Sequence, residues 1–208
     1  MILKFGKYTG QTIDSIYKIN ESYINWLVKQ SWFKKNHSQE YKYCIQCIQK
    51  PLEIIDQDTI IIYTDGACSN NGSKFAKAGI GIHFSKRNKI KFDDVSESLE
   101  ATDNKLTNQR AELYAILKAL RITKEVTNHI IIFTDSEYSI NCVVRWFASW
   151  VSKNKVDEKK NVDLIRPIHQ YYISNNFEFR HIKSHTSLQD EHSLGNEMAD
   201  KLATTCIS

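Results

Sequence analysis

The sequence predicts an α/β protein in which helices flank a mixed sheet and a small, mainly helical unit comes first. Residues 59–64 and 129–134 are runs of β-branched and aromatic residues, which is typical of buried strands. Residues 107–122, which lie between them, place leucine and isoleucine at helical spacing. Such a strand–helix–strand crossover pairs its two strands in parallel. The first fifty residues are rich in lysine, which sets them apart from the rest.

Length and composition agree with one large domain and a smaller one. The chain has 208 residues, of which 41% are hydrophobic and 25% charged, and this suits a globular protein with a buried core. No window holds about 18 consecutive apolar residues, which excludes a membrane-spanning helix. The start lacks the apolar region of a signal peptide. We therefore expect an intracellular protein, with no choice made between cytoplasm and nucleus. We also expect a monomer.

The cysteines also favour an intracellular protein. The five of them are scattered along the chain, as is typical of reduced thiols. Cys44 and Cys47 form a CxxC pair without a second pair or a ligand-spaced histidine pair. This pattern favours two small residues on a helix over a zinc or redox site.

The front unit is basic. Residues 1–52 contain eight lysines and three acidic residues, whereas the charges of residues 53–208 nearly balance. A basic surface permits a polyanionic partner. We expect a small accessory domain at residues 1–50, a linker at 51–58 and the main domain at 59–208.

Within the front unit, a turn or hairpin is expected at residues 5–10, where glycines bound an aromatic segment. Helical spacing follows at 13–17, at 21–30 and at 41–48, and Glu21 or Ser22 can begin the second of these helices. The expected core residues are Trp26, Trp32 and Phe33.

The main domain continues the alternation of strands and helices. Thr107 is the expected N-cap of the helix at 107–122. The further strands are expected at 79–84, 89–95 and 177–182, and the further helices at 137–152, 162–173 and 196–206.

Two strands end in the same way, with Asp65 after residues 59–64 and Asp135 after residues 129–134. If these strands are neighbours, both carboxylates lie at one edge of the sheet, where ligands bind in α/β folds. Glu112, early in the intervening helix, can point to the same place. Asp200 is expected at the start of the last helix among apolar neighbours, where a charge needs a partner.

Four convergent carboxylates would repel one another unless divalent cations neutralise them. Mg²⁺ prefers oxygen ligands, and two such ions can bind both the attacking and the leaving oxygen of a phosphodiester. Each acid also has a plain structural interpretation. An Asp-Gly pair commonly forms a turn, and a Glu early in a helix complements the helix dipole. The residues alone leave both interpretations open.

Several short motifs, in order along the chain, resemble the type 1 ribonuclease H family, particularly its cellular eukaryotic form. The resemblance covers residues 59–205 and implies a ribonuclease H-like five-stranded mixed sheet. It also implies an endoribonuclease that cuts the RNA strand of RNA–DNA hybrids and leaves 3′-hydroxyl and 5′-phosphate ends. The motifs are Tyr63–Gly72, Ala78–Gly81, Thr107–Leu113, Thr134–Ser136 and Gly195–Asp200.

The same resemblance implies catalytic roles for particular residues. Two Mg²⁺ ions, which Mn²⁺ can replace, would be held by Asp65, Glu112, Asp135 and Asp200. His185 matches a loop histidine that assists product release or proton transfer. The loop between His185 and Asp200 is longer than in the family, so His192, which lies inside it, is an alternative.

The family's substrate contacts also have counterparts here. Asn71, Asn108 and Gln109 match the residues that recognise 2′-hydroxyl groups, which donate and accept hydrogen bonds as amides do. Lys105, Thr107 and Asn161 match a phosphate pocket for the DNA strand. Tyr138 and Trp146 match aromatic residues that line the DNA channel, although core packing is the alternative for both. A basic protrusion is matched by lysines 153, 155, 159 and 160.

The front unit resembles a different module, one that is appended to some exonucleases. The segments that carry this resemblance are Phe5–Gly10 and Tyr23–Leu27. We expect it to contact either nucleic acid through its lysines or a protein through exposed aromatic residues. For the whole chain two alternatives stay open: a module that binds hybrids without cutting them, and a strand transferase with the same fold.

Overall fold

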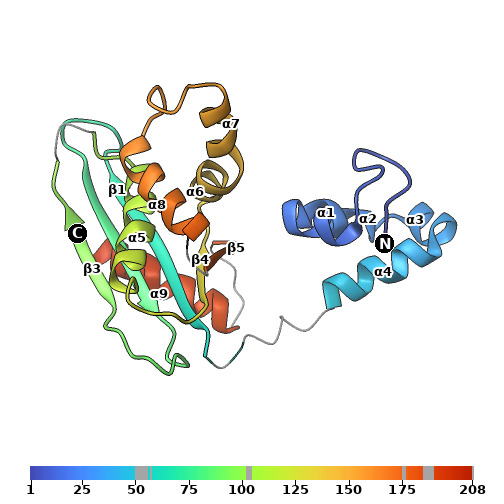
Figure 1. The fold of residues 1–208 in the computed structure, drawn as a ribbon. Coiled ribbons are helices and arrows are strands. Elements are labelled where there is room, and N and C mark those ends of the chain that lie inside the picture. The colour runs from blue at the N-terminus through green and yellow to red at the C-terminus, as the bar shows by residue number, and fades with distance from the viewer. Residues whose placement is uncertain (50–55, 57, 102–104, 175–176, 185–189, 208) are drawn as a thin grey trace. The chain divides into compact units, whose positions relative to one another are not determined.

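The computed structural model describes residues 1–49, 56, 58–101, 105–174, 177–184 and 190–207 (Figure 1). The chain forms two compact units, Met1–Ile55 and Asp56–Ser208. Among the described residues, no helix is both long and apolar enough to cross a membrane.

The second unit contains a mixed five-stranded sheet with the order β3-β2-β1-β4-β5. The strand β1 lies at the centre, antiparallel to β2 and parallel to β4. The edge strands β3 and β5 pair antiparallel with β2 and parallel with β4. The predicted sheet and its parallel crossover are therefore confirmed. The strands are β1 (Ile60–Ser69), β2 (Lys77–Phe84), β3 (Val95–Leu99), β4 (Ile130–Thr134) and β5 (Phe177–His181).

Helices cover both faces of the sheet. Alternate residues of β1 and β2 face α5 on one side and α9 on the other. The side chain of Thr107 caps α5, as predicted, by accepting a hydrogen bond from the backbone N–H of Arg110. A π-helix, η1, interrupts the segment that the sequence predicts as one helix. The helices are α5 (Asn108–Ile122), α6 (Glu137–Ile140), η1 (Asn141–Trp146), α7 (Phe147–Ser152), α8 (Val162–Ser174) and α9 (Glu191–Thr205).

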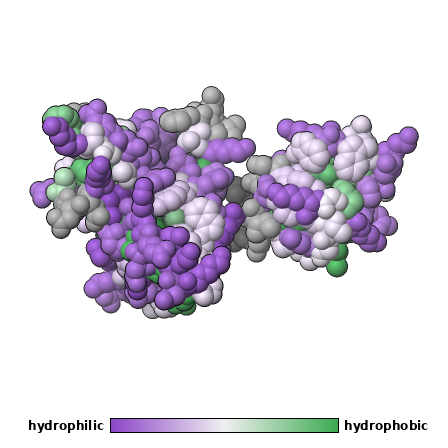
Figure 2. Space-filling model, turned by 90° about the horizontal axis from the view of Figure 1, so that it is seen from above, coloured by the Kyte–Doolittle hydropathy of each residue, from purple (hydrophilic) through white to green (hydrophobic). Residues whose placement is uncertain are grey.

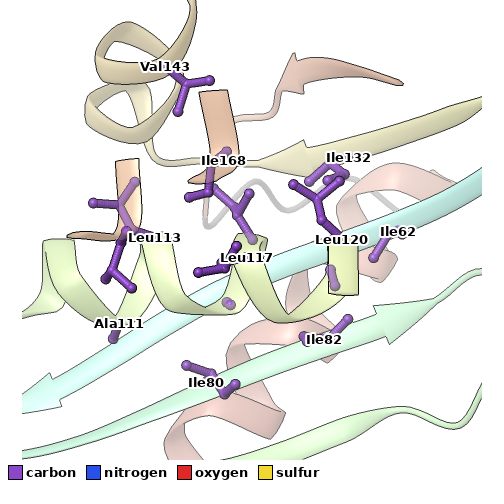
Figure 3. Packing of buried hydrophobic residues seen from close by; sticks show 14 of the residues in the cluster. Ile62, Ile80, Ile82, Ala111, Leu113, Leu117, Leu120, Ile132, Val143 and Ile168 are labelled. Atoms are coloured by element: carbon purple, nitrogen blue, oxygen red, sulfur yellow. The ribbon is translucent and has the colours of Figure 1, made fainter. Parts of the chain in front are cut away.

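The main core lies between α5 and the sheet. Leucines of α5 point toward isoleucines of β1, β2 and β4, and α8 and η1 add residues from the other side of α5 (Figure 3). All of these side chains are buried. The core therefore fixes α5, which carries Glu112, against the strands that lead to the other acids. The residues labelled in the figure are Ile62, Ile80, Ile82, Ala111, Leu113, Leu117, Leu120, Ile132, Val143 and Ile168.

Three element boundaries differ from the prediction. The third strand begins at Val95 rather than at residue 89, because the Asp94 carboxylate accepts hydrogen bonds from the His83 ring and the Phe84 N–H and so turns the chain. The Asp65–Gly66 pair forms no turn, since β1 continues to Ser69 in register with β2. The last helix begins at Glu191, so Asp200 lies in its second half.

The first unit is mainly helical, as predicted. A bridge between Ile2 and Thr12 closes the loop that precedes the helices. Asn20 caps α2, and Phe33 is buried in the core, but Trp26 and Trp32 are 50% and 40% exposed. The prediction that both tryptophans belong to the core is therefore wrong, because isoleucine, leucine and cysteine side chains fill it instead. The helices are α1 (Ile13–Ile19), α2 (Glu21–Leu27), α3 (Ser31–Asn36) and α4 (Ser38–Gln49).

The CxxC pair lies inside this core. Cys44 and Cys47 are both buried free thiols on α4. Burial raises the pKa of Cys44 to about 12, which leaves the thiol protonated and unreactive. Cys44 therefore acts as a small apolar residue, whereas the Cys47 Sγ atom also lies 3.9 Å from the Asp14 carboxylate.

Candidate active site

Three carboxyl groups converge at the centre of the sheet. Asp65, Glu112 and Asp135 each offer an oxygen atom, and these oxygens lie within 4.8 Å of one another. Asp65 comes from β1, Glu112 from α5, and Asp135 directly follows β4. Asp65 and Glu112 are buried, and Asp135 is partly exposed. The site is thus a small acidic cluster that opens to solvent on the side of Asp135.

The sheet brings the two aspartates together because β1 and β4 separate there. Their parallel pairing runs to Tyr63 and Phe133, and each aspartate lies two residues further along the chain, Asp65 within β1 and Asp135 just after β4. In parallel sheets the carboxyl ends of neighbouring strands form the usual binding crevice. The predicted meeting of the two aspartates thus has its origin in this separation, although Asp65 lies inside the central strand β1 rather than after its end.

Two glycines allow the flanking helices to approach the strands. A Cβ atom at Gly66 would lie 2.2 Å from the backbone nitrogen of Glu112, and one at Gly81 would lie 1.9 Å from the carbonyl oxygen of Ala199. Both contacts are with backbone, which cannot move aside as a side chain can. Glycine at these positions therefore sets how close Glu112 and Asp200 come to the cluster.

The carboxyl groups oppose one another's ionisation. Burial, followed by the negative charge of Asp135, raises the pKa of Asp65 from 3.8 to about 7. The pKa of Glu112 is raised well above its usual value by burial and then by the charge of Asp65. The close approach of the two carboxyl groups lowers the pKa of Asp65 and raises that of Glu112, which favours the proton on Glu112. Charge repulsion in a buried place is the physical cause in both cases.

Asp200 lies outside the group of three but within electrostatic reach. Its charge contributes to the raised pKa values of Asp65 and Glu112. It is partly buried on α9, next to Ala199, which packs against β2. A charge at this place adds to the negative potential of the cluster.

The cluster fits a divalent cation. The Oε2 atom of Glu112 is buried, and no hydrogen-bond partner is found for it in the described part of the chain. An unsatisfied buried carboxylate oxygen costs free energy unless it is protonated or bound by a cation. Carboxylate oxygens are the donors that Mg²⁺ and Mn²⁺ prefer.

One group of expected substrate contacts surrounds the start of α5. The Asn71 Oδ1 atom accepts a hydrogen bond from the Asn108 backbone N–H at 3.0 Å, which fixes the loop after β1 against the helix. Thr107 forms the cap of the same helix, and Gln109 is exposed in its first turn. Lys105 is exposed just before the helix. The structure therefore places these five residues within one short stretch around the N-terminus of α5.

A second group lies around Asn161. The Asn161 side chain donates a hydrogen bond to the Tyr138 hydroxyl at 3.3 Å and accepts one from Arg110 at 3.4 Å. Tyr138 is thus a polar partner as well as a packing residue. Trp146, in contrast, is 42% exposed and contacts Trp150, with ring centroids 6.2 Å apart. Its exposure argues against the alternative of core packing.

Sequence analysis missed two residues of this network, Arg110 and Asp163. The Arg110 side chain is nearly buried and forms a two-pronged ion pair with Asp163. This pairing lowers the pKa of Asp163. The pair joins α5 to the start of α8 beside Asn161, which has a positive φ of 59°. Arg110 belongs to the motif Thr107–Leu113 that carries the family resemblance. Its position among the polar residues of that motif was the signal that could have identified it.

The two histidine candidates differ. His185 lies outside the described residues. His192 is buried on α9, where its Nδ1 atom lies 2.9 Å from the Tyr63 hydroxyl and its ring stacks on Phe133 at 4.2 Å. Burial lowers its pKa. These contacts assign His192 to packing between α9 and the sheet.

The strand order, the helices on both faces and the acidic cluster define a ribonuclease H-like α/β fold. Residues 56–208 match the RNase H family. Ribonuclease H of Rickettsia typhi is 32% identical over 148 residues, which cover 69% of this chain and 88% of that protein. Mouse Ribonuclease H1 is 30% identical over 167 residues, 74% of this chain and 54% of that protein. This chain belongs to the RNase H family.

Further comparisons concern the fold and the first unit. A crystal structure of prototype foamy virus protease–reverse transcriptase is similar with a TM-score of 0.62 and 26% identity, over 76% of this chain and 22% of that chain. Residues 3–31 match the Exodeoxyribonuclease X-like C-terminal family, which agrees with the predicted exonuclease-associated module. The chain spans about half the length of its mouse and rat relatives.

Proposed function

We propose that the second unit is an endoribonuclease that hydrolyses the RNA strand of RNA–DNA hybrids with the help of divalent cations. The single observation that carries this proposal is the cluster of Asp65, Glu112 and Asp135 on three separate elements. Membership of the RNase H family and relatives named as ribonucleases H support it. A bound pair of Mg²⁺ ions would supply an activated water and a stabilised leaving oxygen, with 3′-hydroxyl and 5′-phosphate products.

The chain's own residues would hold the ions and position the substrate. Asp65, Glu112 and Asp135 are the proposed ligands, and Asp200 completes the set from α9. We propose that His185 assists proton transfer or product release. Because the carboxyl groups favour protonation when no cation is present, cation binding would displace protons from the cluster.

Selection of RNA would depend on the start of α5. The Oδ1 atom of Asn71 is engaged by the Asn108 backbone N–H, so its amide nitrogen is oriented to donate to a 2′-hydroxyl group. Gln109, exposed beside it, can both donate and accept. A 2′-hydroxyl is what distinguishes RNA from DNA at such a contact.

The DNA strand would be held by residues near the start of the same helix and beside Asn161. Lys105, Thr107 and Asn161 are the proposed phosphate contacts, and Tyr138 and Trp146 the proposed channel residues. Arg110 would position Asn161 through their hydrogen bond rather than touch the substrate.

The test is a cleavage assay on one labelled sequence presented as RNA–DNA hybrid, duplex RNA and duplex DNA. We expect cutting of the RNA strand of the hybrid alone, with Mg²⁺ or Mn²⁺ and not with EDTA. Asp135→Asn should abolish cutting, whereas Asp93→Asn, an exposed aspartate outside the site, should have no effect. Binding of the hybrid without any cutting, or equal cutting of duplex DNA, would refute the proposal.

A further inference from the structure

Aromatic rings gather on the surface of the first unit. One row joins Tyr8, Tyr23 and Trp26, with centroid distances of 4.8 and 5.7 Å. A second row joins Phe5 and Trp32 at 5.4 Å. Both rows start from the loop at residues 5–8. We call this set the aromatic surface; its members are Phe5, Tyr8, Tyr23, Trp26 and Trp32.

The two tryptophans of this surface contact other aromatic rings and are also partly exposed to solvent. Trp26 is 50% and Trp32 40% exposed, although Phe33, next in sequence, is fully buried. Other rings hold them in place through edge-to-face and tilted contacts. On the face drawn in Figure 2 the first unit carries pale and green residues bordered by purple, hydrophilic ones. Large exposed aromatic groups held in fixed positions are typical of a binding surface.

Positively charged side chains lie next to these rings in the sequence. Lys4 and Lys7 flank Phe5, and Lys29 lies in sequence between the two tryptophans; all three are exposed. Among the described residues, no ion pair involves any of them. The acidic residue Asp14 is engaged elsewhere, by the Tyr43 hydroxyl at 2.8 Å. The lysines are therefore available to an anionic ligand.

We propose that the aromatic surface binds single-stranded nucleic acid. Trp26 and Trp32 would stack on unpaired bases, and Lys4, Lys7 and Lys29 would contact the phosphates between them. Stacking platforms with flanking cations are how proteins bind single strands without sequence preference. A duplex offers the phosphates but hides the faces of its bases, so the exposed tryptophans favour a single strand over a hybrid.

This second activity is independent of the nuclease site. A strand bound at the first unit would raise the effective concentration of the second unit near a hybrid that continues into a single-stranded flank. We expect hybrids with such a flank to be cut at lower enzyme concentration than blunt hybrids.

Binding is tested with the full chain in EDTA, so that no cleavage occurs. The probes are fluorescent oligo(dT) and oligo(rU), a blunt hybrid and a polyglutamate peptide, read by fluorescence anisotropy. We expect oligo(dT) and oligo(rU) to bind, and Trp26→Ala and Trp32→Ala each to weaken this binding by about fivefold or more while leaving binding of the blunt hybrid, which the second unit is proposed to hold, unchanged. Trp26→Phe should keep most of it, and Ile173→Ala, an exposed apolar residue of the second unit, all of it.

A charge variant separates stacking from phosphate contacts. Lys29→Gln should lower affinity for both single strands and reduce the slope of log affinity against log salt by about one unit or less. Equal single-strand binding by wild type and both tryptophan variants would overturn the proposal, as would an equal loss of blunt-hybrid binding in those variants or a preference for polyglutamate over the single strands. Far-ultraviolet circular dichroism of each variant checks that the fold is kept.

Discussion

Replacement of Asp65 by asparagine should stabilise the cation-free protein while it destroys the nuclease. The side chain is buried and lies within 4.8 Å of two other carboxyl groups. Asparagine has the same shape, and its Oδ1 atom can still accept the hydrogen bond that Asp65 receives from the Gly66 N–H at 2.8 Å. The substitution therefore removes a charge without opening a cavity.

The magnitude follows from the raised pKa of Asp65. This value rises from 3.8 to about 7 on folding, and each unit corresponds to about 1.4 kcal/mol. The folded state binds the proton more tightly than the unfolded state, so ionisation lowers stability as the pH rises between these two values. Linkage gives a penalty of about 2 kcal/mol at pH 5 and about 4 kcal/mol at pH 8. Asp65→Asn should relieve most of it.

The assay is denaturant unfolding of wild type and Asp65→Asn in EDTA at pH 5 and at pH 8. We expect the variant to be more stable at both pH values, with an advantage that grows by about 2–3 kcal/mol from pH 5 to pH 8. Asp93→Asn serves as the control for loss of an exposed charge. A variant that is less stable than wild type at pH 8, or an advantage that does not change with pH, would refute the reasoning.

Four further predictions concern three residues around the site. Gly81→Ala should lower unfolding free energy by about 2 kcal/mol or more and impair cleavage, because its Cβ would lie 1.9 Å from the Ala199 carbonyl oxygen; normal stability in urea would contradict the close packing. His192→Ala should destabilise by about 2 kcal/mol through loss of its Tyr63 contact and ring stacking, while kcat below the melting range stays unchanged; a selective loss of kcat would make this histidine catalytic. The lowered pKa of His192 also predicts that its contribution to stability falls as pH drops below about 6.5, and the variant should lose that dependence in unfolding measurements. Arg110→Lys should raise KM for the hybrid with little change in kcat, because lysine lacks the planar fork that holds the neighbouring network; unchanged KM in steady-state kinetics would remove the positioning role.

Periodicity and strand composition were enough to predict the sheet of the second unit. In the runs at 59–64 and 129–134, the central residues 60–63 and 130–133 are isoleucine, tyrosine and phenylalanine because both faces of β1 and β4 are covered, and such runs are hard to mistake. The third strand was harder. Residues 89–95 carry the apolar pattern, but Asp94 uses its carboxylate to end the preceding strand, and the polar segment Val95–Leu99 forms the edge strand instead.

The front unit shows what spacing alone cannot decide. Trp26 and Leu27 are neighbours on α2, and each fits a helical pattern. Leu27 is fully buried while Trp26 is half exposed, because a helix only seven residues long presents one narrow face to its neighbours. The sequence predicts that one face is buried, but which face depends on how α1 and α4 pack, and that is settled by tertiary contacts.

The acidic site was predicted in part from the local sequence pattern, and in part it depends on tertiary contacts that the pattern does not give. The ends of the two central strands were readable from the chain, but the approach of Glu112 and Asp200 depends on the two glycine contacts with helix backbone. Burial of the Asp65 carboxylate, followed by the negative charge of Asp135, opposes folding by about 4 kcal/mol at pH 8. A cation present at one hundred times its dissociation constant contributes about 2.7 kcal/mol to the folded state, so it offsets most of this penalty. The negative charge that Asp65→Asn removes is one of those proposed to attract the cation, so this variant should lose the rise in melting temperature that we expect Mg²⁺ to produce in wild type.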